Sequence, residues 1–281
     1  MKKWFLFYFL LCYSITLAAQ PQYTRSDSLK VVRLLKMGKT FGQDENLMIR
    51  FARELKGLPY VGKTLDRNVN ERLVVNLRQM DCTTYVENVL ALAICTRKGQ
   101  TTFRDFCRQL QLIRYRQGHV SYTDRLHYFS AWIEDNTRLG FVREVQAPNP
   151  PFTAVQTLRI NYMSHHPHLY PMLVKHPGWV KGIAEMEQEL NGLTYSYIPK
   201  QEIADDTLFR STIHDGDIIA IITSRDGLDT SHIGIAVWHA DGLHMLNAST
   251  VHGRIVEEPM LLKTYMKRHP SQVGIRIIHV Q

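Results

Sequence analysis

The strongest constraint on the fold is the order of two hydrophobic patterns along the chain. Apolar residues recur at helical spacing in the N-terminal half, within segments 27–37, 44–56, 81–97 and 103–113. Alternating or continuous apolar runs typical of strands occupy the last third, at 217–223, 232–238, 243–248 and 275–280. Because helices come first and strands last, without regular alternation, the sequence predicts an α+β fold.

The first 19 residues are typical of a targeting segment rather than of a folded element. Lys2 and Lys3 precede a short apolar run that ends in Ala18 and Ala19. A membrane-spanning helix needs about 20 apolar residues, so a cleaved secretory signal is favoured over an uncleaved anchor. We therefore expect a signal peptide at 1–19 and one domain at 20–281. The mature protein would be exported, periplasmic or extracellular, and not held in a membrane.

Export bears on the cysteines, because disulfides persist in oxidising compartments. Signal cleavage would leave Cys82, Cys95 and Cys107, so at least one thiol cannot pair within the chain. Cys95 and Cys107 lie in apolar helical patterns that suit inert buried thiols, and whether they pair is open. Cys82 is therefore the thiol that most needs a chemical explanation.

The charge distribution argues against a nucleic-acid partner. The chain has 34 basic and 26 acidic residues, a formal net charge of +8, but the basic residues are scattered. A histidine-rich stretch contains His165, His166, His168 and His176, which are residues of a type that binds zinc. Neighbouring residues in a proline-rich loop rarely point to one centre, so we expect no metal and no cofactor.

Cys82 stands where a helix is predicted to begin. Asp81 is a good N-cap residue for that helix, and the unpaired N–H groups of a helix start favour a negatively charged sulfur. A nucleophilic thiol also needs a general base, and His232 at the start of a strand is the candidate. Gly234 and Ala236 share a strand face with His232, so we expect the Cys82 helix to pack closely against that face.

A third polar group would orient the imidazole of His232. Asn247, on the next predicted strand, can hold the ring nitrogen that faces away from the sulfur. His244 is a competitor for this role, although three positions from Asn247 a regular strand would turn it to the opposite face.

The ordered set of motifs resembles a known family. The chain contains Leu58-Pro59-Tyr60-Val61-Gly62, then Met80-Asp81-Cys82-Thr83-Thr84-Tyr85-Val86-Glu87, Asp124-Arg125-Leu126-His127-Tyr128-Phe129, Asn161-Tyr162-Met163-Ser164, His232-Ile233-Gly234-Ile235 and Leu246-Asn247-Ala248-Ser249. Together these resemble the N-acetylmuramoyl-L-alanine amidase-like branch of the NlpC-type papain-like cell-wall hydrolases, from about residue 40 to the C-terminus.

The resemblance implies a papain-like fold, in which the Cys-bearing helix packs on an antiparallel sheet with extra helices around it. It also implies that Cys82 is the nucleophile, His232 the base and Asn247 the residue that orients it. The third member is often His in these enzymes, so Asn247 departs from the commoner choice. The expected reaction is attack of Cys82 on the amide between N-acetylmuramic acid and L-alanine, followed by hydrolysis.

Further residues are candidates for the oxyanion and substrate sites. Tyr60 matches a tyrosine beside the sulfur, and Asp81, Arg125, His127 and Ser231 complete the predicted set. For Arg125 two interpretations stay open: contact with a substrate carboxylate, or packing over aromatic rings.

Three alternatives to the amidase remain at this stage. An endopeptidase of the same fold would cut the stem peptide after γ-D-glutamate, and a degenerate site would only bind muropeptides. A cysteine acyltransferase would have to exclude water. In each case the expected partner is a muropeptide or peptidoglycan fragment, and we expect a monomer.

Overall fold

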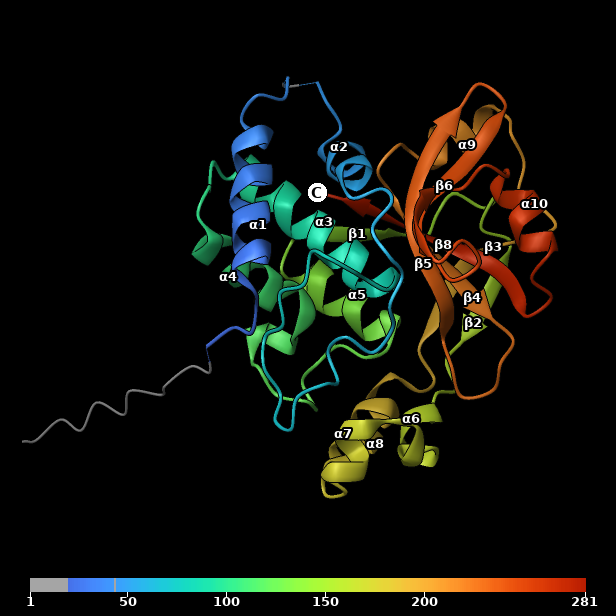
Figure 1. The fold of residues 1–281 in the computed structure, drawn as a ribbon. Coiled ribbons are helices and arrows are strands. Elements are labelled where there is room, and N and C mark those ends of the chain that lie inside the picture. The colour runs from blue at the N-terminus through green and yellow to red at the C-terminus, as the bar shows by residue number, and fades with distance from the viewer. Residues whose placement is uncertain (1–19, 43) are drawn as a thin grey trace, which may run out of the picture.

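The computed structural model describes residues 20–42 and 44–281 of the chain (Figure 1). The predicted signal peptide at 1–19 lies outside the described residues. In the part that is described, no helix has both the length and the apolarity that crossing a bilayer requires.

One antiparallel sheet of eight strands organises the molecule. Its order is β2-β3-β8-β4-β5-β6-β7, and β1 pairs with β8 beside this path. The strands are β1 (Val142–Val145), β2 (Ala154–Thr157), β3 (Thr194–Pro199), β4 (Ile218–Thr223), β5 (Thr230–His239), β6 (Gly242–Ser249), β7 (Arg254–Glu257) and β8 (Gln272–Val280). The predicted α+β class and its four C-terminal strands are confirmed. The sequence did not predict β1, β2, β3 and β7.

Helices cover both faces of the sheet. The α-helices of the described residues are α1 (Arg25–Gly38), α2 (Leu47–Glu54), α3 (Cys82–Arg97), α4 (Phe103–Arg114), α5 (Phe129–Arg138), α6 (Tyr162–His165), α7 (Pro171–Lys175), α8 (Trp179–Leu190), α9 (Thr207–Thr212) and α10 (Leu262–Lys267). The helices α1 to α5 gather on one side of the sheet, and α9 and α10 lie on the other (Figure 1). Two apolar cores result, one on each side.

The helix α3 is buried among its neighbours because its sequence is apolar on almost every side. A fully buried ion pair fixes it to α4: Arg114 Nε donates to Glu87 Oε2 over 2.7 Å. The same guanidinium donates to the carbonyl oxygen of Val74. Removing one partner would leave a buried charge alone, at a cost of about 3–5 kcal/mol. This pair therefore fixes α3 against α4.

The strand β5 presents different residues to the two cores. Ile233 and Ile235 face the core that contains α3, whereas Ala236 belongs to the core under α9 and α10. A Cβ on Gly234 would lie 2.9 Å from the carbonyl oxygen of Leu246 and closer still to the Met245 side chain. The expectation that Gly234 and Ala236 make room for the Cys82 helix is therefore wrong. Their small size accommodates the second core.

Candidate functional site

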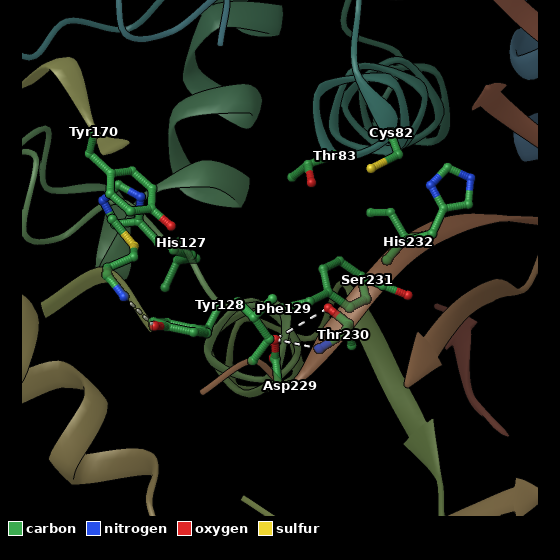
Figure 2. A pocket seen from close by; sticks show the side chains of 14 residues that line it. Cys82, Thr83, His127, Tyr128, Phe129, Tyr170, Asp229, Thr230, Ser231 and His232 are labelled. Atoms are coloured by element: carbon green, nitrogen blue, oxygen red, sulfur yellow. Dashed lines mark hydrogen bonds between the residues drawn. The ribbon is translucent and has the colours of Figure 1, made fainter. Parts of the chain in front are cut away.

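A pocket of about 200 Å³ opens where the N-terminus of α3 meets the start of β5 (Figure 2). Its other walls come from the segment before α5, from α6 and from the turn before α7. The lining residues are Cys82, Thr83, Leu126, His127, Tyr128, Phe129, Met163, Tyr170, Leu228, Asp229, Thr230, Ser231, His232 and Ile233. The structure thus brings Cys82 and His232, 150 positions apart in the sequence, to one hollow.

Cys82 is the first residue of α3 and is only partly exposed. Burial and the negative charge of Asp81 raise the pKa of its thiol to about 11, although backbone N–H groups of Ile233 and Thr83 favour the thiolate. The helix start does supply donors to the sulfur, as the sequence suggested, but desolvation outweighs them. At neutral pH the sulfur is therefore a protonated thiol.

His232 and Asn247 lie on adjacent strands and contact each other. The distance from His232 Nε2 to Asn247 Oδ1 is 3.1 Å, so the ring donates its Nε2 proton to the amide oxygen. This bond leaves Nδ1 as the unprotonated nitrogen, and one ring nitrogen of His232 is turned toward Cys82 in Figure 2. Burial lowers the pKa of His232 to about 4, against the opposite effect of Asn247. The imidazole is neutral at pH 7 and able to accept a proton.

His244, the competitor for the third position, has other partners. Its Nδ1 bonds to the carbonyl oxygen of Glu258 over 2.9 Å, and its Nε2 lies 3.1 Å from Asp241 Oδ1. The alternation along β6 therefore works as expected. Asn247, and not His244, contacts His232.

Tyr60 and Asp81 flank Cys82 outside the pocket lining. Burial and the nearby Cys82 and Asp81 raise the pKa of Tyr60 to about 12, which keeps its hydroxyl protonated. The carboxylate of Asp81 accepts the N–H of Thr84 over 2.9 Å, and the N–H of Asp81 donates to the Thr84 hydroxyl over 3.0 Å, which forms a capping box. Asp81 is thus engaged in fixing the helix start.

His127 and Ser231 line the pocket, as their assignment to the substrate site requires. His127 lies across the pocket from His232 (Figure 2). Its Nε2 donates to the carbonyl oxygen of Tyr122 over 2.8 Å, and burial holds its pKa well below the usual value. Nδ1 of this neutral ring is then an acceptor for a substrate N–H or O–H group. Ser231 is exposed at the rim.

Arg125 is buried away from the pocket lining. Its guanidinium pairs with Asp66, lies 3.7 Å from Glu71 Oε1, and packs over the ring of Tyr122 at 4.7 Å. Two carboxylates of the protein therefore already neutralise it. Of the two interpretations given above, this geometry favours packing over an aromatic ring.

Several lining residues escaped the sequence analysis. Tyr170 and Leu228 come from turns, where no periodic pattern marks them. Met163 stood within a quoted motif, and the structure gives the reason for that motif: its N–H bonds to Glu187 Oε1 over 3.0 Å and to the Tyr128 hydroxyl over 3.1 Å. This network closes the wall opposite Cys82.

Cys95 and Cys107 are buried free thiols in the structure, so they do not form a disulfide there. The histidine-rich stretch lies beside the pocket wall, with His166 bonded to the carbonyl oxygen of Tyr162 and His176 to that of Val69. Over residues 20–42 and 44–281, one group has the spacing of metal ligands: His214, Asp217 and His279. This group lies outside the pocket.

Comparisons with known proteins place the chain in a family. The family model described as N-acetylmuramoyl-L-alanine amidase-like matches residues 50–275. A structure named N-acetylmuramoyl-L-alanine amidase, from Bacteroides uniformis, is 36% identical with a TM-score of 0.77, over 87% of this chain and 99% of that one. A Bacteroides fragilis structure described as a xylanase candidate is 39% identical with a TM-score of 0.76, over 82% and 99%.

A more distant Legionella pneumophila structure shares the fold, at 22% identity and a TM-score of 0.67, over 91% of this chain and 94% of that one. Among curated proteins, no match was found.

Proposed function

The chain belongs to the N-acetylmuramoyl-L-alanine amidase-like family, and on that premise we propose that it is a cysteine-dependent amidase of peptidoglycan fragments. The proposed scissile bond is the amide between the lactyl group of N-acetylmuramic acid and L-alanine. One observation carries the cysteine mechanism: Cys82 and His232 line a single pocket, and Asn247, which lies outside that lining, contacts His232. The arrangement also supports assignment to the NlpC-type papain-like fold.

The first step is formation of a thioester. Because the thiol and the imidazole are both neutral at pH 7, the Cys82 proton passes to Nδ1 of His232 as the sulfur attacks the lactyl carbonyl carbon. The N–H of Cys82 and the Tyr60 hydroxyl are the proposed donors to the oxyanion. His232 then gives the proton to the alanine nitrogen, and the C–N bond breaks.

The second step is hydrolysis of the thioester. His232 takes a proton from water, the hydroxide attacks the carbonyl carbon, and the sulfur leaves with the proton that His232 returns. Asn247 keeps Nε2 protonated throughout, so that Nδ1 stays the basic nitrogen. His127 and Ser231 are proposed to position the substrate through hydrogen bonds.

A glycosidase activity, which the name of the Bacteroides fragilis structure raises, fits this pocket poorly. Most glycosidases use two carboxyl groups at the scissile bond. Among the described residues that line the pocket, Asp229 is the single carboxylate. Both of its oxygens accept backbone N–H groups over 2.7 Å, from Ser130 and Thr230.

We propose that residues 1–19 are a secretory signal, that residues 20–281 form one domain, and that the mature protein acts as a monomer in the periplasm or outside the cell. Detection of the mature chain, beginning near Gln20, in the exported fraction would support this, and an intact N-terminus in the cytoplasm would contradict it.

Digestion of defined muropeptides, followed by mass spectrometry, tests the activity. The amidase releases a free peptide that begins with L-alanine and a sugar with a lactyl carboxylate. Cleavage within the stem after γ-D-glutamate would show the endopeptidase instead, and transfer to an added amine would show an acyltransferase. Binding without any product would show the degenerate site. Cys107→Ala, which removes a buried thiol elsewhere, is the matched control for Cys82→Ala.

A further inference from the structure

We propose that His214, Asp217 and His279 form a binding site for one Zn²⁺ ion, at the end of β4 away from the pocket. The three residues come from separate places in the chain: the turn after α9, the residue before β4, and the end of β8. Their ligand atoms all lie within 4.8 Å of one another. The site is independent of the proposed amidase chemistry.

The geometry directs both imidazoles at one carboxylate. His279 Nδ1 lies 2.8 Å from Asp217 Oδ1, and His214 Nδ1 lies 3.9 Å from Asp217 Oδ2. The two rings stack with centroids 5.0 Å apart and an interplanar angle of 24°. A zinc ion needs N and O ligands at about 2.0–2.2 Å, so a small rotation of the exposed His214 would complete three of the four positions.

The electrostatics of the buried Asp217 carboxylate favour a bound cation at this site. The Asp217 side chain is 6% exposed, and its ion-pair partners within the described residues are these two imidazoles. A buried carboxylate is costly to leave without a compensating positive charge. A divalent cation would neutralise it. Two imidazoles and a carboxylate are a ligand set that zinc prefers.

The surroundings leave room for the ion. His214 is 58% exposed, so water can fill the remaining coordination position. Asp217 Oδ2 also accepts the backbone N–H of His214 over 2.7 Å, which holds the carboxylate toward that ring. Arg143 pairs with His279 across β1 and β8, but it is exposed and its guanidinium can extend into solvent.

The position of the site indicates a stabilising role. On β4, Ile221 pairs with His232 of the pocket, whereas Asp217 precedes Ile218 at the other end of the strand. A bound ion would tie the turn after α9 to β8. Binding that is confined to the folded state raises the free energy of unfolding, and with it Tm, as the zinc concentration increases.

Zinc titration of chelator-treated, full-length mature protein tests the proposal, with a chromophoric chelator as the competitor. We expect one equivalent bound by the wild type, and at least about tenfold weaker binding by His214→Ala and Asp217→Asn. His119→Ala is the matched control, because His119 also contacts an aspartate, Asp124, but belongs to no three-ligand group among the described residues. It should bind zinc like the wild type.

Two further measurements keep the test decisive. Circular dichroism checks that Asp217→Asn folds. If this variant does not fold, the test rests on His214→Ala alone, since His214 is exposed. Zinc should raise Tm of the wild type and not that of His214→Ala. Equal affinity in wild type and His214→Ala, or the absence of a stoichiometric site in the wild type, would overturn the proposal whatever the amidase assay shows.

Discussion

Near each end of β4, a histidine on a neighbouring strand contacts a polar partner. The two partners differ, and each determines what its imidazole can do. At the pocket end, His232 contacts the amide of Asn247, which orients the ring without adding charge. At the other end, His279 contacts the buried carboxylate of Asp217. An oriented neutral imidazole is suited to accept a proton from a thiol, whereas imidazoles gathered on a carboxylate are suited to hold a cation.

The largest expected effect comes from removing the sulfur. Cys82→Ala should lower kcat/KM for muropeptide hydrolysis by about 10⁴-fold or more, since Cys82 is the one thiol among the described residues that line the pocket. Steady-state assays with mass-spectrometric detection measure this loss, and circular dichroism checks the fold. Hydrolysis at a comparable rate by Cys82→Ala would contradict the cysteine mechanism. The control Cys107→Ala should keep wild-type activity.

The state of the thiol can be read from its alkylation. With a pKa of about 11, Cys82 should react with iodoacetamide at pH 7 roughly two orders of magnitude more slowly than an ordinary exposed cysteine. The rate should rise with pH without a plateau near neutrality. Asp81→Asn keeps a good cap but removes the negative charge, so it should react several-fold faster than the wild type at pH 8. A plateau at low pH would instead indicate a thiolate–imidazolium pair.

Exchanging the partner of His232 tests the comparison directly. Asn247→Ala should lower kcat/KM by about 10²-fold, because nothing then fixes the tautomer. Asn247→Asp should place a carboxylate beside the ring of His232, and a negative charge there favours the protonated imidazole. The acidic limb of the pH–rate profile should then move to higher pH. An unchanged acidic limb in Asn247→Asp would show that Asn247 does not act through His232.

The smallest expected effect concerns stability in acid. His232 has a pKa of about 4 in the folded state and about 6.5 in an unfolded chain. Its contribution to the free energy of unfolding is therefore complete above pH 6.5 and is lost as the pH falls to 4. The loss amounts to at most about 3 kcal/mol. Urea denaturation across this range should show a steeper decline for the wild type than for His232→Gln. Parallel declines would contradict the low pKa.

Much of the fold followed from local pattern. The helix from Cys82 to Arg97 could be predicted because Asp81 is a cap and the residues after it are apolar. The strands β4, β5, β6 and β8 carry long runs of apolar residues, so the sequence identifies them as strands whatever their pairing partners are. By contrast, β1 and β2 have four residues each and exist because β8 and β3 supply their hydrogen bonds. No local signal marks such strands.

The sequence by itself determined the thiol at a capped helix start, the strand that carries His232, and the amide on the next strand. Only the tertiary structure decided that these groups meet, that burial leaves the thiol and the imidazole neutral, and that Gly234 serves the second core. It also decided that Asp66 and Glu71 already pair with Arg125. The physical reason is that periodicity and capping act over a few residues, whereas desolvation and charge pairing depend on neighbours from distant parts of the chain.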